Sequence, residues 1–88
     1  MLRVQRSVKR GKLTFTLAGR LNAEQVAEME ALFRSGAGNQ EIVLDLKDLT
    51  LVDRDAVRFL ERCEAENIKL ENSPAYIREW ITRERGSR

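Results

Sequence analysis

The stretch that decides the fold is residues 41–59, which read EIVLDLKDLTLVDRDAVRF. Its first half is a nearly continuous apolar run, broken first at Asp45. A run of this length and composition predicts a strand buried on both faces, which is typical of the centre of an α/β sheet. Asp53 ends the run and is placed to cap a helix whose first turn is charged.

The residues before this stretch predict an antiparallel hairpin. Residues 2–8 alternate loosely between apolar and polar, and residues 12–18 alternate cleanly, with Leu13, Phe15 and Leu17 on one side. Between the two runs, Gly11 supplies the positive φ that a tight turn requires. We therefore expect two paired strands at the start of the chain.

A helix is predicted between this hairpin and the central strand. Asn22 is a good N-cap, and Gln25 follows at the spacing of a capping box. Apolar residues, including Met29 and Phe33, then recur at helical spacing and form a stripe that faces the core. Gly36 and Gly38 are expected to end the helix.

The residues after the central strand predict a helix, a short strand and a last helix. On the helix that begins at Asp53, four residues are expected to face inward: Ala56, Phe59, Leu60 and Cys63. Four others are expected to face water: Arg58, Glu61, Arg62 and Glu64. Asn67 should end this helix before a short strand at residues 68–70, and Ser73-Pro74 should open the last helix. Charged residues dominate from Arg83 on, so we expect residues 82–88 to form a frayed tail.

These elements give the order β-β-α-β-α-β-α, an α/β fold with a mixed four-stranded sheet. Crossover units of strand, helix and strand are right-handed and parallel, so the second, third and fourth strands should be parallel. The first strand should pair with the second in the antiparallel sense. The 88 residues are expected to form a single domain over residues 1–88.

The composition excludes several kinds of chemistry. The chain has one cysteine, Cys63, and no histidine, so an internal disulfide, a multi-cysteine metal site and histidine-based catalysis are excluded. We therefore predict a non-enzymatic protein without a cofactor. No apolar run is long enough to cross a bilayer, and the first residues lack the apolar centre of a signal peptide, so a cytoplasmic location without membrane insertion is expected. The basic residues near both ends are interpreted as solvated surface rather than as a nucleic-acid site.

Two motifs together resemble the STAS domain of bacterial anti-sigma factor antagonists. The first is the string Gly19-Arg20-Leu21-Asn22, and the second is VLDLKDLTLVD at residues 43–53, with an aspartate that opens the next helix. The resemblance covers residues 13–80. It implies a STAS-like sheet with helices packed against it and a role in regulation.

The chain departs from the family at the position of its phosphorylation switch. In antagonists of this family, the helix-opening aspartate is followed by a serine or threonine, which a partner kinase phosphorylates. Here the corresponding residues are Arg54 and Asp55, followed by Ala56, and neither of the first two carries a hydroxyl group. No phosphorylation is therefore expected, and Arg54 instead places a permanent positive charge at the start of the helix.

The resemblance points to a protein-interaction surface at the start of this helix. The predicted partner-binding residues are Thr50, Asp53, Arg54, Asp55 and Arg58. The partner would be a kinase-like ATPase or an anti-sigma factor in bacterial signalling. Asp45, Asp53 and Asp55 would have structural or capping roles rather than catalytic ones.

Two alternatives to this signalling role stay open. The chain could be an accessory STAS subunit of an ABC-type lipid transporter, which would bind the transporter ATPase. It could instead be a small-molecule domain that binds a nucleotide or lipid in a pocket near Asp53. The sequence also allows a homodimer.

Overall fold

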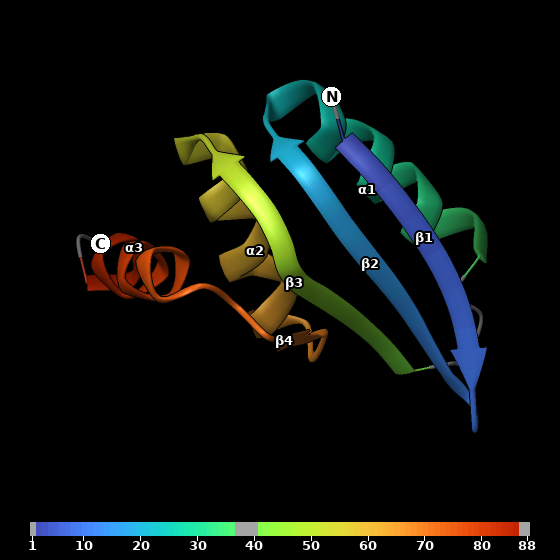
Figure 1. The fold of residues 1–88 in the computed structure, drawn as a ribbon. Helices are drawn as coiled ribbons and strands as arrows, with labels where there is room; N and C mark the ends of the chain where they lie inside the picture. The colour runs from blue at the N-terminus through green and yellow to red at the C-terminus, as the bar shows by residue number, and fades with distance from the viewer. Residues whose placement is uncertain (1, 37–40, 87–88) are drawn as a thin grey trace.

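The computed structural model describes residues 2–36 and 41–86, which form four strands and three helices (Figure 1). In chain order they are β1 (Leu2–Lys9), β2 (Lys12–Leu21), α1 (Ala23–Gly36), β3 (Glu41–Val52), α2 (Arg54–Ala65), β4 (Lys69–Glu71) and α3 (Ala75–Gly86). This order confirms the predicted β-β-α-β-α-β-α arrangement. Gly36 is the last residue of α1, as expected, whereas Gly38 lies outside the described residues.

The strands form one mixed sheet in the order β1-β2-β3-β4. β1 pairs with β2 in the antiparallel sense, and the pairs β2–β3 and β3–β4 are parallel, as the crossover rule predicted. The β1–β2 turn uses two residues with positive φ, Arg10 at 51° and Gly11 at 78°. Only Gly11 was expected in that conformation, and Arg10 adopts it because a two-residue turn of this type requires positive φ at both positions.

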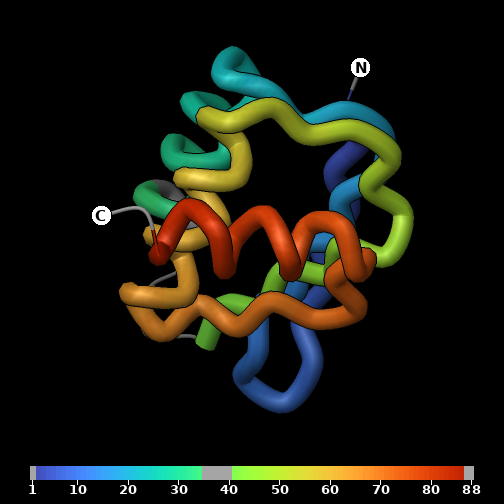
Figure 2. The backbone as a smooth tube through the Cα atoms, turned by 90° about the vertical axis from the view of Figure 1, so that its left-hand side faces the viewer, coloured from blue at the N-terminus to red at the C-terminus, as the bar shows by residue number. Residues whose placement is uncertain are grey.

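Two helices cover one face of the sheet, and the third lies beside them. Figure 1 shows α1 and α2 behind the strands, and Figure 2 shows α3 crossing in front of α2 on the side of β4. The ring of Phe33 on α1 lies 5.5 Å from that of Phe15 on β2 and 5.9 Å from that of Phe59 on α2, so one aromatic cluster joins the three elements. The buried core consists of Leu13, Phe15, Leu17, Leu21, Val26, Met29, Leu44, Leu46, Leu49, Val52, Ala56, Val57, Phe59, Leu60, Cys63, Ile77 and Ile81.

The prediction that the central strand is buried on both faces is wrong for most of β3. Val43 and Leu44 are adjacent and both buried, so the two faces are covered at that point. Further along, Lys47, Asp48 and Leu51 are exposed. The reason is that α1 and α2 cover a single face of the sheet, so side chains of β3 that point to the other face are open to solvent (Figure 1).

Glu61 was expected to face water and is instead buried, with 5% of its surface exposed. It lies one helical turn after Val57 on α2, and residues four apart share a helix face. α3 packs against α2, so α2 is covered on a second side (Figure 2). Periodicity within α2 could not reveal this contact, because it depends on where α3 crosses.

The last helix is longer than predicted. α3 continues to Gly86, so the expected tail is wrong for residues 82–86, and residues 87–88 lie outside the described part. Arg85 donates a hydrogen bond to Glu64 of α2 at 2.8 Å, which ties the final turn down. The helix begins at Ala75, with the carbonyl of Pro74 accepting the first bonds from Ile77 and Arg78. No helix within the described residues is long and apolar enough to cross a membrane.

Candidate functional site

Asp53 caps two helices at once. One carboxylate oxygen, Oδ1, accepts a 2.8 Å hydrogen bond from the backbone N–H of Ala56, which confirms the predicted N-cap of α2. The other oxygen, Oδ2, accepts a 3.3 Å bond from the N–H of Ala23, the first residue of α1. The backbone N–H of Asp53 also bonds to the carbonyl of Leu21 at 3.3 Å. Both oxygens therefore bond within the fold, and Asp53 positions the start of α2.

The capping box at the start of α1 is also present. Asn22 Oδ1 accepts bonds from the N–H groups of Glu24 and Gln25, at 3.0 and 3.4 Å, and the Asn22 N–H donates to Gln25 Oε1 at 3.2 Å. The starts of α1 and α2 therefore lie side by side and share Asp53. This junction holds the first turn of α2 at a fixed place beside the end of β3.

Arg54 and Arg58 converge on one carboxylate of α3. Arg54 Nε lies 3.0 Å and Arg58 Nε lies 3.4 Å from the same oxygen, Oε1, of Glu84. The arginine side chains are 63% and 50% exposed, whereas that of Glu84 is only 12% exposed. The two residues stand one helical turn apart on α2, so the three side chains form a compact group that we call the Arg54–Arg58–Glu84 cluster.

The positive charge of this cluster changes the acidity of Glu84. The hydrogen bond from Arg54 is the main cause that lowers the pKa of the Glu84 carboxyl, and Arg58 adds to it. Glu84 is therefore ionised at neutral pH and balances one of the two guanidinium charges. The cluster keeps a net positive charge at the surface, which suits a carboxylate or phosphate group of a partner.

The other two predicted residues, Asp55 and Thr50, are not part of this cluster. Asp55 is exposed in the first turn of α2, where a negative charge favours the helix dipole. Thr50 is exposed at the end of β3, and its hydroxyl donates a 3.0 Å bond to the carbonyl of Gly19 on β2. Asp45 accepts bonds from the Lys47 N–H and the Asn72 side chain, which confirms its structural role.

Cys63 is a buried residue of α2 and is not an activated nucleophile. Burial raises the pKa of the Cys63 thiol from 9.0 to about 12, and the neighbouring Glu66 carboxylate acts in the same direction. The thiol is therefore protonated and a poor nucleophile at neutral pH. Within residues 2–36 and 41–86, no group of three or more histidine, cysteine, aspartate or glutamate side chains could hold a metal ion.

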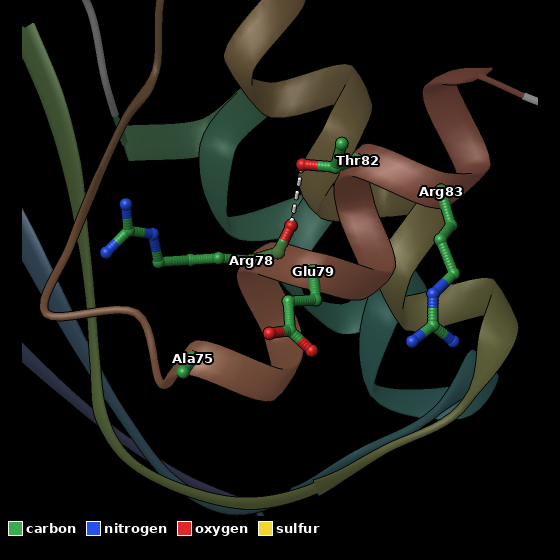
Figure 3. Close-up of a pocket in the computed structure, with 5 residues that line it drawn as sticks. All are labelled: Ala75, Arg78, Glu79, Thr82 and Arg83. Carbon is green, nitrogen blue, oxygen red and sulfur yellow. Dashed lines mark hydrogen bonds between the residues drawn. The ribbon is translucent and has the colours of Figure 1, made fainter.

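One open alternative predicted a ligand pocket beside Asp53. Three hollows on the surface are lined by other residues. A hollow of about 530 Å³ follows the outer face of α3 and is lined by Ala75, Arg78, Glu79, Thr82 and Arg83. Figure 3 shows Arg78 and Arg83 extending to opposite sides, and the Thr82 hydroxyl donating to the Arg78 carbonyl at 3.0 Å. Two smaller hollows, of about 410 and 190 Å³, are lined by residues that do not include Asp53.

Sequence reasoning missed Glu84, which organises the two arginines. Glu84 stands 30 positions after Arg54 and within a segment that was expected to be a tail. The pairing depends on the angle at which α3 crosses α2, and no local spacing records that angle. A faint signal was present, because Glu84 is one of two acidic residues, with Glu79, in a final helix that is otherwise rich in arginine.

The fold has clear relatives among solved structures. The anti-sigma factor antagonist SpoIIAA, solved in its unphosphorylated form, superposes with a TM-score of 0.69 at 18% identity, over 93% of this chain and 82% of that one. The chain has the SpoIIAA-like fold. An uncharacterised DUF3478-family protein from Shewanella loihica PV-4, described as SpoIIAA-like, matches at TM-score 0.59 and 15% identity, over 98% of this chain and 78% of the other.

A third match covers most of this chain but only a small part of the other protein. The structure of Mglu superposes at TM-score 0.59 and 19% identity over 81% of this chain but only 19% of its own length. No protein-family model and no curated protein matches the chain. The SpoIIAA-like fold confirms the predicted α/β class and the STAS-like architecture, and at these identities the likeness concerns the fold alone.

Proposed function

We propose that this SpoIIAA-like chain is a non-enzymatic regulatory module that binds a partner protein through the Arg54–Arg58–Glu84 cluster. The observation that carries the proposal is a pair of exposed arginines, one turn apart on α2, whose guanidinium groups both contact a single carboxylate. The resemblance to anti-sigma factor antagonists supports the start of this helix as the surface for partner contact. The proposed partner is a kinase-like ATPase or an anti-sigma factor in bacterial signalling.

Permanent charge replaces a phosphorylation switch in this proposal. A phosphorylated side chain would add about −1.5 to −2 charges at the helix start. Arg54 instead keeps that position positive at every physiological pH, since an arginine is not deprotonated in proteins. We therefore expect binding that is constitutive and that depends on an acidic group of the partner.

The test compares tagged variants in pull-downs from the native host, with quantitative mass spectrometry of the bound proteins. Arg54→Gln combined with Arg58→Gln removes both cations. Arg62→Gln is the matched control, because Arg62 lies on the same helix and is 53% exposed but pairs with Glu30 of α1. Glu84→Gln is the second control, since it breaks the cluster and leaves both arginines in place.

An ATPase-domain protein or an anti-sigma factor that is bound by the wild type and both controls, and lost with the double variant, would support the proposal. A truncation of two such contacts is expected to weaken binding at least tenfold, or about 1.4 kcal/mol. Equal recovery with the double variant would exclude this surface. Recovery of a transporter ATPase would favour the accessory-subunit alternative.

A further inference from the structure

The positive charge of the chain is concentrated in its first strands. Residues 1–23 carry six basic side chains and no acidic one, whereas residues 24–88 carry ten basic and fourteen acidic side chains. Arg3, Arg6, Lys9 and Arg10 are exposed on β1 and its turn, and none of the four forms an ion pair with the described residues. A further basic residue of the hairpin, Lys12, does form an ion pair, with its Nζ 3.9 Å from Oε2 of Glu41. We call β1 with these four cations the basic edge.

The backbone of β1 is open along its outer side. β1 is an eight-residue strand whose partner in the described sheet is β2 alone. The two-residue turn places Lys9 opposite Lys12 in a hydrogen-bonded pair, and the pairs of an antiparallel ladder then alternate. Val4, Arg6 and Val8 therefore direct their N–H and C=O groups away from β2. These three residues can form about six hydrogen bonds with an added strand.

The side chains of the same three residues follow the order apolar, basic, apolar along the edge. Val4, Arg6 and Val8 lie opposite Leu17, Phe15 and Leu13, so they share the helix-covered face of the sheet. Val4 is 37% exposed and Val8 is 53% exposed, which leaves apolar surface on both sides of the Arg6 charge. An added strand would place its alternate side chains directly against this series.

We propose that β1 is a docking edge for an extended acidic segment of a partner protein, which joins the sheet as a further strand. The fitting segment has an acidic residue opposite Arg6 and apolar residues opposite Val4 and Val8, with acidic residues beyond them. Main-chain hydrogen bonds would supply affinity, and the alternate side chains would supply specificity. This surface is separate from the Arg54–Arg58–Glu84 cluster, so the inference does not depend on the proposed function.

The charges argue against two other occupants of the basic edge. A second copy of this chain could pair β1 with β1, but an antiparallel pair centred on Arg6 would set Arg6 against its counterpart. Like charges directly opposite each other are destabilising, so self-pairing is disfavoured. Single-stranded nucleic acid requires exposed aromatic rings for stacking, and Phe15, the aromatic residue of this hairpin, is buried.

The experiment measures binding of a short peptide to the full chain by fluorescence anisotropy. The dye-labelled peptide EVTETVE reads the same in both directions, so it presents the same side chains whether it pairs parallel or antiparallel. Two control peptides carry the same label: KVTKTVK reverses the charge, and EEVVTTE keeps the composition but loses the alternation. Amide chemical shifts of the protein, measured by NMR, locate the bound peptide.

Three variants divide the contributions of charge and backbone. Arg6→Glu reverses the central charge and is expected to weaken EVTETVE at least about tenfold. Val4→Pro removes one outward N–H and is expected to weaken it by a similar factor, because proline is tolerated on an edge strand whose N–H faces solvent. Arg20→Glu, an equal charge change at an exposed position of β2, should change the affinity less than about twofold. If the proline variant does not fold, Arg6→Glu still tests the proposal.

Shift changes confined to β1, with binding lost in Arg6→Glu and unchanged in Arg20→Glu, would support the docking edge. The proposal would be overturned by the absence of EVTETVE binding at about 1 mM protein, a weak limit for a real contact. Equal binding of EEVVTTE, or full binding by a folded Val4→Pro variant, would overturn it as well. Tighter binding of duplex DNA or of phosphatidylglycerol vesicles than of EVTETVE would assign the basic edge to those ligands instead.

Discussion

The double cap at Asp53 gives a quantitative prediction about stability. Its two carboxylate oxygens serve different helices, with Ala56 bonded to one at 2.8 Å and Ala23 to the other at 3.3 Å. Asp53→Ala removes both bonds, whereas Asp53→Asn keeps one acceptor oxygen for α2. In the asparagine variant the amide group faces the Ala23 N–H with its own donors, so only the link to α1 is lost.

The magnitudes follow from these contacts. The N-cap of α2 contributes about 1 kcal/mol to the free energy of unfolding. The bond from Ala23 to a charged but half-buried acceptor contributes about 1 kcal/mol more. We therefore expect Asp53→Ala to lower the free energy of unfolding by about 2 kcal/mol and the melting temperature by about 10 °C, and Asp53→Asn by about half as much.

Thermal and urea unfolding followed by circular dichroism measure these differences at pH 7. Asp55→Asn is the matched control, because Asp55 lies in the same first turn but makes no side-chain bond to the described residues, and its loss should cost about 0.3 kcal/mol. If Asp53→Ala destabilised the protein no more than Asp55→Asn, the double cap would not contribute as argued. If the alanine and asparagine variants were equal, the bond to Ala23 would be negligible.

Two further predictions concern ionisation. The lowered pKa of Glu84 means that its stabilising contribution is present above pH 4.5 and is lost as the pH falls through its folded value. The melting temperatures of wild type and Glu84→Gln should therefore differ at pH 7 and converge well below pH 4.5, and a difference that stayed the same at low pH would contradict this reasoning. Burial raises the pKa of the Cys63 thiol from 9.0 to about 12, so at pH 8 the reactive thiolate is about 1,000-fold rarer in the folded protein than in urea. Cys63 should therefore react with a thiol reagent about 1,000-fold more slowly in the folded protein. Comparable rates in the two states would contradict its burial.

Local patterns predicted the elements of this fold. The alternation of Leu13, Phe15 and Leu17 gave β2 and its buried side. Asn22 and Asp53 marked the starts of two helices correctly, because a cap bonds to a backbone group two or three residues away and such a spacing is visible in the sequence. The strand directions followed from the handedness of crossovers, which holds for any chain of this order.

Contacts between distant segments could not be predicted in this way. The bond from Ala23 to Asp53 and the contact of Arg54 with Glu84 each join residues 30 positions apart. The burial of Glu61 likewise depends on the packing of α3 against α2. These contacts are set by how whole helices pack, and a list of apolar positions leaves that packing open.

The cluster at the proposed site determines how a partner would engage it. A partner carboxylate that contacts Arg54 and Arg58 has to compete with Glu84, which holds both from α3. Burial of Ile77 and Ile81 anchors α3 with about 1.5–3 kcal/mol for each side chain, whereas the exchange of one carboxylate for another on exposed arginines is close to neutral. We therefore expect the Glu84 side chain to move while the helix stays in place. It follows that Glu84→Gln should bind the partner at least as tightly as the wild type, and weaker binding by this variant would mean that Glu84 itself contacts the partner.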